Sequence, residues 1–351
     1  MNDISSRITC KNKGNRPLIP LTISAQDGLI NQYDYFDKQI ASLNLSTYYI
    51  LKKGQFAYNK SYSNGYPYGA IKRLERYDEG ALSSLYICFE LKNIDSTFMC
   101  KYFDSNKWNY EVKLISGEGA RNHGLLNLSP SDFFNIKLYV PTNKIEQLKI
   151  AKFIELVQMK IDVTRAKYDT LKKYKKGLLN SLLDGSNTFI QLGDFCDLYQ
   201  PQTIPQTKFI ADGEFNVYGA NGIIGKYNEF NHFNSEIIIG CRGNCGSVVF
   251  TLPKSWINGN AMVVKINKDI GISKIDLFYE LQAINYRKYI EKSGVPQITC
   301  QKAKKIRIPR LSSADNKIIL IQKIDKKIDI LNASLLYIRN IKRYLLNSMF
   351  I

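Results

Sequence analysis

The sequence has few of the residues that most often build catalytic or metal sites. It contains two histidines, His123 and His232, one in each half of its 351 residues. A Ser/His/Asp or Cys/His catalytic arrangement would therefore arise only by coincidence. The seven cysteines form no C-x-x-C pair, and a zinc site would have to join Cys241 and Cys245 to distant ligands. We therefore expect no metal site, and we interpret the cysteines as free thiols in a reducing compartment.

Long apolar runs are also absent. No run approaches the roughly 20 residues that a membrane-spanning helix requires, and the opening MNDISSRITCKNKGN lacks the apolar core of a signal peptide. We therefore expect a cytoplasmic protein without a membrane partner. The chain has no G-x-x-x-x-G-K-S/T phosphate loop and no Asn-Pro-Pro-aromatic or Asp-Pro-Pro-Tyr tetrapeptide of the amino-methyltransferases. These absences argue against a nucleotide-driven motor and a methyltransferase, and we expect no cofactor to be bound by this chain.

Positive charge is present in excess. Lys and Arg number 49 against 31 Asp and Glu, which gives a net charge of +18. Such an excess favours a polyanionic partner, either nucleic acid or an anionic membrane surface. Because the sequence offers no membrane anchor, nucleic acid is the stronger interpretation.

The second half of the chain repeats the first at an offset of 170 residues. This offset superposes Ile136 on Ile306, Ile154 on Ile324 and Tyr174 on Tyr344. After a gap of three residues, LLNS at 178–181 matches LLNS at 345–348. The repeat predicts a duplicated architecture.

Each half ends in a long helical pattern, from about residue 143 to 183 and from about 313 to 350. Apolar residues recur there in steps of three and four, with charged residues between them. Forty helical residues extend about 60 Å, which is too long to pack fully against a small domain. We therefore expect the two helices to pair with each other as an antiparallel coiled coil.

A region typical of β-structure lies ahead of each helix. Short β-branched and aromatic runs, such as SSLYICFEL (83–91) and MVVKI (262–266), are separated by Gly and Asn turns. The predicted fold class is α+β, with two β-rich domains in tandem, each followed by a long helix, in a pseudo-twofold internal repeat. The predicted boundaries are 1–142 for the first domain, 143–186 for the central helix, 187–311 for the second domain and 312–351 for the last helix.

Several loops carry the side chains that DNA recognition needs. Arg pairs with guanine, and Asn or Gln pairs with adenine, so a DNA reader needs these residues on exposed loops. The second half offers GCRGNCG (240–246) between two predicted strands and QITCQKAKKIRIPR (297–310), which has five positive charges and no acid. The first half offers GEGARNHG (117–124) and the tyrosine-rich YNKSYSNGYPYG (58–69). A structural turn, a solvated basic face and core tyrosines are the corresponding structural alternatives.

Fifteen residues of these loops and their neighbours are predicted to bind DNA. In the first half they are Asn59, Lys60, Tyr62, Tyr66, Arg121, Asn122 and His123. In the second half they are Tyr218, Asn221, Arg242, Asn244, Asn258, Gln297, Thr299 and Lys302. In the glycine loop, we expect Arg242 and Asn244 to point toward DNA and the two cysteines to pack inward.

These segments resemble the specificity (S) subunits of Type I restriction–modification systems. In the second half the resemblance rests on YGANGIIGKYNEF, EIIIGCRGNCGSVVF, WINGNAMVV and GVPQITCQKAKKIRIP, in this order. In the first half, GQFAYNKSYSNGYPYGAIKRL and EGALSSLYICFEL are similar to another type of target-recognition domain in the family. Family members usually open with a strand similar to Phe189–Tyr199. This chain begins at Asn2-Asp3-Ile4, so we expect a residue or two of that element to be absent or replaced.

The resemblance implies a non-catalytic subunit that reads double-stranded DNA. Each of two target-recognition domains would read one half of a split sequence, and the paired helices would set the distance between the halves. Two modification (methyltransferase) subunits would dock on the helices and contribute the S-adenosylmethionine chemistry, and restriction (nuclease-motor) subunits would join them.

Two other functions stay open at this point. One is a stand-alone DNA-binding coiled-coil protein without a methyltransferase partner. The other is a metal-dependent nuclease built on Glu90 and Lys92 after a hydrophobic strand, with Asp78 upstream. An E-x-K sequence is common, however, and this one also fits an ordinary solvated pair on one strand face.

Overall fold

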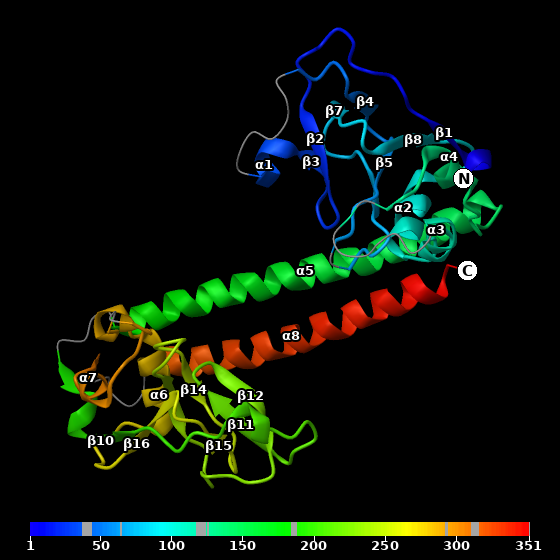
Figure 1. Ribbon diagram of the computed structural model, residues 1–351. Coiled ribbons are helices and arrows are strands. Elements are labelled where there is room, and N and C mark those ends of the chain that lie inside the picture. The colour runs from blue at the N-terminus through cyan, green and yellow to red at the C-terminus, as the bar shows by residue number, and fades with distance from the viewer. Residues whose placement is uncertain are drawn as a thin grey trace. The chain divides into compact units, whose positions relative to one another are not determined.

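The computed structural model divides the chain into two compact units. It describes residues 1–36, 44–63, 65–116, 124, 126–183, 188–291, 294–309 and 316–350. The first unit comprises Met1–Thr164 and Ser334–Ile351, and the second comprises Arg165–Ala333. Each unit holds one β-rich head and part of each of two long helices (Figure 1). No helix in these described ranges is long and apolar enough to cross a membrane.

The head of the first unit is built on two four-stranded sheets. Its strands are β1 (Ser5–Arg7), β2 (Pro20–Ser24), β3 (Gly28–Asn31), β4 (Tyr49–Lys52), β5 (Phe56–Asn59), β6 (Ala70–Arg73), β7 (Glu79–Leu82) and β8 (Ile87–Leu91). One sheet has the order β1-β8-β5-β6 and is antiparallel throughout. The other has the order β3-β2-β7-β4, in which β2 and β7 run parallel. The accompanying helices are a 3-10 turn (Asn2–Ile4), α1 (Gln32–Phe36), α2 (Ser96–Asp104), α3 (Asn109–Ser116) and α4 (Pro130–Asn135).

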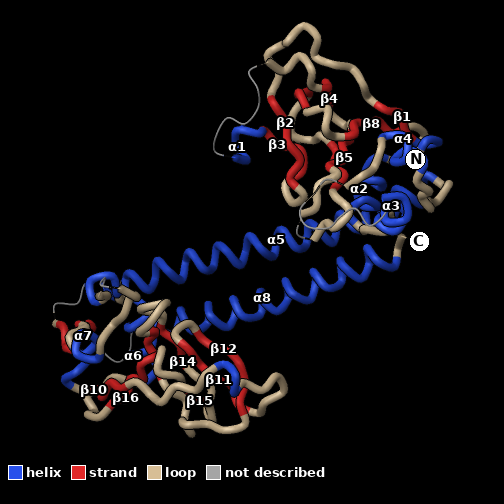
Figure 2. Tube along the Cα trace, viewed as in Figure 1, coloured by secondary structure: helices blue, strands red, loops and turns tan. Residues whose placement is uncertain are grey.

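The head of the second unit repeats this plan, with its strands in three sheets. Its strands are β9 (Phe189–Gln191), β10 (Cys196–Tyr199), β11 (Phe215–Gly219), β12 (Gly222–Tyr227), β13 (Ile237–Gly240), β14 (Val248–Phe250), β15 (Trp256–Ile257), β16 (Ala261–Ile266) and β17 (Arg307–Pro309). The sheet orders are β10-β16-β13-β14, β12-β11-β15 and β17-β9. The helices are α6 (Lys274–Ala283), α7 (Cys300–Lys304) and 3-10 turns at Leu192–Asp194, Gln206–Lys208 and Tyr286–Tyr289. Figure 2 shows how the strands gather in each head.

The two heads share one topology. The order β1-β8-β5-β6 corresponds strand by strand to β10-β16-β13-β14, and both sheets are antiparallel. The hairpin β2–β3 corresponds to β11–β12, and the parallel pair β2–β7 corresponds to β11–β15. The repeat found in the sequence is therefore a repeat of strand connections as well.

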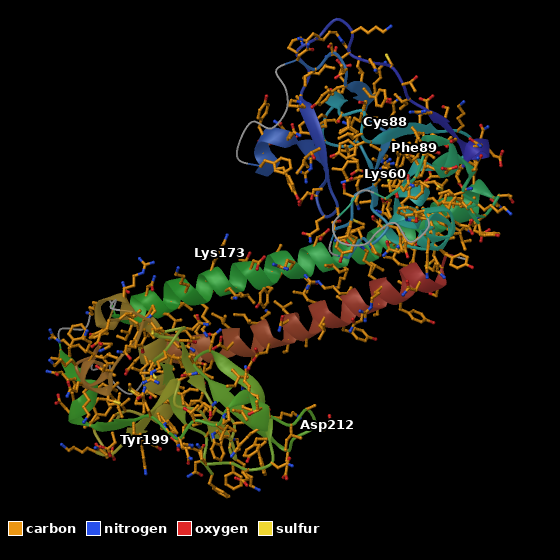
Figure 3. All side chains as sticks on the ribbon, viewed as in Figure 1. Lys60, Cys88, Phe89, Lys173, Tyr199 and Asp212 are labelled. Carbon is orange, nitrogen blue, oxygen red and sulfur yellow. The ribbon has the colours of Figure 1, made fainter. Side chains whose placement is uncertain are left out.

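The alternating direction of side chains along the central strands explains how the central sheet of each head contacts a layer on both of its faces. In β8, Ile87 and Phe89 are buried against the helices of the head, whereas Cys88 between them is buried against the second sheet (Figure 3). In β13, Ile237 and Ile239 join the helix-side core and Ile238 joins the other. Because successive strand residues point to opposite faces, an unbroken apolar run is what a sheet covered on both faces requires. Each head is therefore a layer of helices, a central sheet and a second sheet.

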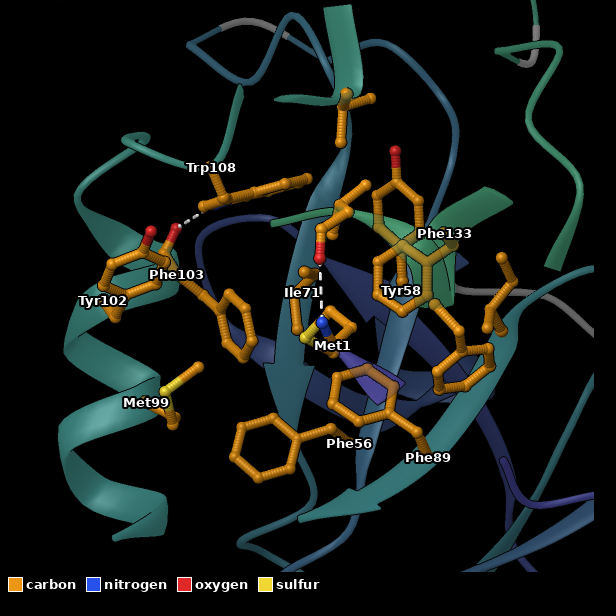
Figure 4. Close-up of a cluster of buried hydrophobic side chains, with 14 of the residues drawn as sticks. Met1, Phe56, Tyr58, Ile71, Phe89, Met99, Tyr102, Phe103, Trp108 and Phe133 are labelled. Atoms are coloured by element: carbon orange, nitrogen blue, oxygen red, sulfur yellow. Dashed lines mark hydrogen bonds between the residues drawn. The ribbon is translucent and has the colours of Figure 1, made fainter. Parts of the chain in front are cut away.

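Aromatic side chains fill the helix-side core of the first head (Figure 4). Tyr58 stacks on Phe133 at 4.9 Å between ring centroids, and its hydroxyl donates to the carbonyl of Tyr68 at 2.7 Å. Trp108 is buried edge-on to Tyr58, and its indole N–H donates to the carbonyl of Phe103 at 2.9 Å. Full burial of such a side chain contributes about 1.5–3 kcal/mol, so this cluster anchors the β5–β6 hairpin.

The opening turn of the first head matches the corresponding turn of the second. Met1 is buried and its amino group donates to the carbonyl of Ile136 at 2.8 Å, as Figure 4 shows. In the second head, the backbone N–H of Leu192 donates to the carbonyl of Ile306, also at 2.8 Å. Since Ile136 and Ile306 are repeat partners, Met1 stands where the second head has Leu192. The turn Asn2–Ile4 that follows Met1 therefore corresponds to the turn at Leu192–Asp194 in the second head.

The long helices α5 (Lys144–Leu183) and α8 (Asn316–Ser348) pair along their length (Figure 1). Lys342 donates to Gln158, Lys175 to Asp325 and Lys317 to the carbonyl of Ser181. The residue numbers in these three contacts add up to 500, 500 and 498, which is the signature of antiparallel helices. The prediction of two β-rich regions, each followed by a long helix that pairs with the other, is confirmed.

The register of the helices agrees with the internal repeat. Residues 165 and 335 are repeat partners, because their numbers differ by 170. They also face each other in the antiparallel pair, because their numbers add up to 500. The boundaries between the two units lie beside these positions, after Thr164 and after Ala333. The duplication in the sequence and the division into units therefore share one midpoint on each helix.

Candidate nucleic-acid interface

The glycine loop 240–246 closes the hairpin between β13 and β14. The N–H of Gly246 donates to the carbonyl of Gly240 at 2.8 Å, and the N–H of Gly240 donates to that of Ser247 at 2.7 Å. Gly243 and Gly246 have φ of +75° and +85°, the left-handed region that favours glycine. At Gly240 a Cβ would lie 2.3 Å from the carbonyl oxygen of Asn244 and 2.4 Å from that of Ala220. Only glycine fits where these backbone segments meet.

The side chains of this loop divide as the sequence predicted. Cys241 is fully buried and accepts a hydrogen bond from Gln200, while Cys245 packs on the same core and donates to the carbonyl of Pro296. Arg242 and Asn244 are exposed. Burial raises the pKa of both thiols, so they stay protonated and unreactive at neutral pH. The cysteines therefore hold the loop, and the arginine and the asparagine face solvent.

Two further segments meet this loop. Ser247, which follows it, donates to the side chain of Asn221 in the β11–β12 turn at 2.9 Å. On the other side, Arg242 forms a β-bridge with Gln297, and the N–H of Ile298 donates to the carbonyl of Cys241 at 2.9 Å. A turn, a hairpin loop and the segment ahead of α7 thus form one continuous surface.

One carboxylate organises the basic edge of this surface. Glu291 accepts a hydrogen bond from the Gln297 amide at 3.3 Å and forms an ion pair with Lys302 at 3.1 Å. The charge of Lys302 is therefore partly balanced within the protein. In the described part of the chain, no ion pair engages Arg242, so its guanidinium carries the charge of the loop. Five predicted residues, Asn221, Arg242, Asn244, Gln297 and Lys302, are brought together here.

Three other predicted residues of the second head have structural roles. Tyr218 is buried and its hydroxyl accepts from the N–H of Leu252, and Asn258 is buried and bonds to both backbone groups of Ile204. Thr299 caps α7 by accepting from the N–H of Lys302. Because a buried, fully bonded side chain is not available to a base edge, the structure corrects the prediction for Tyr218 and Asn258. For Thr299 it shows a helix cap in place of a free hydroxyl.

The first head carries the equivalent hairpin, β5–β6, with a longer loop. Asn59 accepts from the N–H of Ser61, and the ammonium group of Lys60 donates to the carbonyl of Leu128 at 3.0 Å (Lys60 is labelled in Figure 3). Tyr62 is exposed, whereas Tyr66 is half-buried against the second sheet with the Lys72 ammonium 5.3 Å from its ring centre. The predicted residues are therefore gathered on one loop, but Lys60 is engaged in holding it.

In the first head, too, a hairpin turn, a hairpin loop and the segment ahead of a short helix meet. The N–H of Leu126, in the segment ahead of α4, donates to the carbonyl of Lys60, as Ile298 does to Cys241 in the second head. The predicted residues Arg121, Asn122 and His123 precede this contact but lie outside the described residues. The repeat thus extends from strand order to the loops that surround the candidate surface.

Sequence reasoning missed the turn between β2 and β3. Gln26 and Asp27 of this turn line a groove of about 480 Å³ together with Asn59, Ser63 and Tyr86. Both Gln26 and Asp27 are exposed. The available signal was Asp27-Gly28 between two apolar runs, which indicates a hairpin turn. Its correspondence to the turn at Asn221 emerges only from the shared sheet topology.

The structure does not assemble a nuclease site around Glu90. The carboxylate of Glu90, on β8, accepts hydrogen bonds from the side chains of Ser6 and Gln55. Asp78 directly precedes β7 of the other sheet and forms an ion pair with Lys53. Within the described ranges, no group of three or more His, Cys, Asp and Glu side chains is placed to hold a metal ion. The proximity of carboxylates that metal-dependent cleavage needs is not found at these residues.

Known proteins share both a domain and the whole fold with this chain. Residues 186–347 match the family model of the Type I restriction modification DNA specificity domain. The chain is similar to the S subunit of a Type I restriction–modification system from M. genitalium, with 14% identity and a TM-score of 0.64, over 100% of this chain and 94% of that one. No curated protein matches the chain in sequence.

Two more solved structures have the same fold over nearly the full length. One, from work on complex assembly and conformational transition of the type I R-M system, has 13% identity and a TM-score of 0.58 over 99% of this chain and 95% of that one. The other is the HsdS subunit from Thermoanaerobacter tengcongensis, with 13% identity and a TM-score of 0.50 over 99% and 95%. The second half of the chain thus matches the Type I restriction modification DNA specificity domain, and the whole chain has the fold of the S subunit from M. genitalium.

Proposed function

We propose that this chain reads a bipartite DNA sequence, with one head on each half-site. The observation that carries the proposal is the convergence, in both heads, of a hairpin turn, a hairpin loop and the segment ahead of a short helix. In the second head this surface presents Arg242, Asn244 and Asn221, whose donors and acceptors suit guanine and adenine edges. A net charge of +18 supplies the attraction to phosphates that precedes readout.

The paired helices are proposed to act as a spacer. In this proposal residues 1–142 and 187–311 are the target-recognition domains, and 143–186 and 312–351 are the spacer helices. Two heads on a stiff spacer gain affinity by effective concentration only where both half-sites fit at once. The length of the helix pair would then determine the gap between the half-sites.

The chemistry is proposed to come from partners. Two modification subunits would dock on α5 and α8 and bring S-adenosylmethionine, and restriction subunits would join this complex in the cytoplasm. What supports this division of labour is the match of residues 186–347 to the Type I restriction modification DNA specificity domain, together with the fold shared with the S subunit from M. genitalium.

A methylome tests the proposal directly. The chain would be expressed with its cognate modification subunit in a host without DNA methylation, and the modified bases would be sequenced. We expect a split motif with a fixed central gap. A complex that forms but adds no methylation, or a motif without a gap, would contradict bipartite reading.

A matched insertion tests the spacer. Four residues would be inserted into both helices, after Leu171 in α5 and after Asp329 in α8, which the register pairs. The added turn lengthens the pair by about 6 Å, which corresponds to about two base pairs of DNA. We expect the gap in the methylated motif to widen while both half-sites stay unchanged, and an unchanged gap would rule out the spacer role.

A further inference from the structure

Two aliphatic side chains of the second head are left in water beside the glycine loop 240–246. Val295 is 71% exposed and Ile223 is 57% exposed. Ile223 lies in β12, just after the β11–β12 turn, and Val295 lies in the segment ahead of α7. These are the two segments that meet the loop. A single exposed apolar residue is ordinary on a protein surface, but two beside the polar residues of the candidate interface call for an explanation.

The turn before Ile223 is bonded to the residue that follows the loop. Gly222 pairs with Gly219 to close this turn, and Asn221 within it accepts a hydrogen bond from Ser247 at 2.9 Å. Ser247 directly follows the loop. Ile223 therefore lies two residues from a fixed contact beside the loop and belongs to the same surface.

Val295 is held beside the loop by the two residues that follow it. The carbonyl of Pro296 accepts a hydrogen bond from the thiol of Cys245 at 3.1 Å. Gln297 comes next and forms a β-bridge with Arg242. Val295 is nevertheless the most exposed of the large apolar residues in the described ranges. The backbone thus fixes the place of Val295 and leaves its side chain open.

The first head buries the residue that corresponds to Ile223. In both hairpins a glycine opens the second strand, and the next residue is Leu29 in β3 and Ile223 in β12. Leu29 is 2% exposed and lies in the core between the sheets, on which Tyr66 of the longer β5–β6 loop packs. The shorter loop of the second head has no aromatic residue. The same strand position therefore serves the core in one head and faces solvent in the other.

We propose that Ile223 and Val295 contact the C5-methyl groups of thymines in the half-site of the second head. The inference rests on the proposed function, in which this surface reads base edges. In the major groove, base pairs present hydrogen-bond donors and acceptors together with one apolar group, the thymine methyl. Aliphatic side chains neither donate nor accept hydrogen bonds, so this methyl group is the one that suits them. Arg242 and Asn244 supply the polar contacts beside them.

Uracil in place of thymine tests the contact, because it removes the methyl group and leaves the hydrogen-bonding edge unchanged. The target is the duplex identified by the methylome, and the protein is the full chain in complex with its cognate modification subunit. Burial of one methyl group corresponds to about a fourfold change in affinity. We expect uracil to weaken binding about fourfold at one or two thymines of the half-site whose preference depends on Arg242.

Truncation of the two side chains assigns the methyl contacts. We expect Ile223→Ala and Val295→Ala each to weaken binding of the thymine duplex about fourfold and to abolish the uracil effect at one position. Both residues are exposed, so the fold tolerates the changes. The matched control is Leu252→Ala, because Leu252 is a 55% exposed aliphatic residue of the same head, beyond the end of β14 that is opposite the loop. This control should bind the thymine duplex as the unchanged chain does and keep the full uracil effect.

Several results would overturn the inference. A half-site without thymine is one, and equal affinity for uracil and thymine at every position of that half-site is another. A uracil effect that stays the same in both Ile223→Ala and Val295→Ala is a third, since another group would then contact the methyl. In each case the complex still binds its split target, so the proposed function stands. A complex that binds the target no better than unrelated DNA would instead refute the proposed function, and this inference with it.

Discussion

The hairpins β5–β6 and β13–β14 occupy the same place in the two heads but are built in different ways. In the second head, seven residues join the strands, and glycines at 240, 243 and 246 let the backbone turn within hydrogen-bonding distance of itself. In the first head, ten residues join the strands, and Gly65 and Gly69 also have positive φ. Here side chains add further bonds, from Lys60 to Leu128 and from Tyr58 to Tyr68.

This difference separates what the framework fixes from what the loops vary. Both heads share the sheet order and the parallel strand pair. They also share the backbone hydrogen bond that joins the hairpin loop to the segment ahead of α4 or α7. Loop length and loop composition are not. Residues on loops supported by a rigid scaffold can change without loss of the fold, so one architecture can present two different loop surfaces.

The largest expected effect concerns a difference in the cores of the heads. Counted from the helix caps Asp95 and Ser273, Glu280 of α6 stands where α2 has Tyr102. Glu280 is buried, and its Oε2 atom has no hydrogen-bond partner among the described residues. Burial, with a smaller contribution from the charge of Asp276, raises the pKa of Glu280 to about 8.

The folded second head therefore keeps a proton that the unfolded chain releases above pH of about 4.5. The stability that this group contributes is fully present below that pH and is lost as the pH rises through about 8, by on the order of 5 kcal/mol in total. We expect Glu280→Gln to remove this dependence. In urea titrations of the 5-fluorotryptophan-labelled chain, Trp256 reports the second head and Trp108 the first. An equal pH dependence of the Trp256 signal in both proteins would contradict the assignment.

The next effect tests the glycine construction of the second hairpin. Gly240→Ala places a Cβ within 2.4 Å of two carbonyl oxygens of the backbone, so the loop has to shift. We expect a loss of about 2 kcal/mol in the stability of the second head, measured by urea unfolding, together with weaker methylation of one half-site. The matched control is Gly243→Ala, where a Cβ meets open space and only the left-handed backbone opposes it, at about 1 kcal/mol. A larger loss for Gly243→Ala would refute the packing argument.

A smaller effect is expected for the exposed cation of the same loop. Arg242→Ala removes a side chain that no ion pair engages within the described residues, so the stability of the head should stay within about 0.5 kcal/mol. The affinity of the assembled complex for its target should fall about tenfold, with relaxed preference at one half-site only. Binding assays on targets mutated in either half-site measure both effects. Unchanged affinity and preference would remove Arg242 from the reading surface.

Regular features of the molecule were predictable because they repeat. Apolar spacing predicted α5 and α8, since burial of one face imposes this short period on a helix. The 170-residue offset predicted two heads, since a repeated sequence folds into a repeated structure. Whether a single loop residue is exposed or buried was harder to predict from the sequence. Tyr218 and Asn258 belong to motifs rich in DNA-binding residue types, but the burial of Tyr218 between two sheets and of Asn258 against Ile204 became evident only from the structure. Gln26 and Asp27 were missed because their relation to Asn221 depends on sheet order and not on sequence similarity.

The smallest effect is expected at Lys60, the predicted DNA contact that the structure engages within its own head. Its ammonium group donates to the carbonyl of Leu128 and so links the hairpin loop to the segment ahead of α4. Lys60→Ala removes one hydrogen bond from a charged donor and should destabilise the first head by about 1 kcal/mol. Because this donor is already engaged, the loss of DNA affinity should be less than the tenfold expected for Arg242→Ala. The Trp108 resonance measures the first effect, and binding to targets altered in one half-site measures the second. If Lys60→Ala weakened DNA binding more than Arg242→Ala, the bond to Leu128 would have to break on binding, and the first hairpin would read DNA through the lysine that holds it closed.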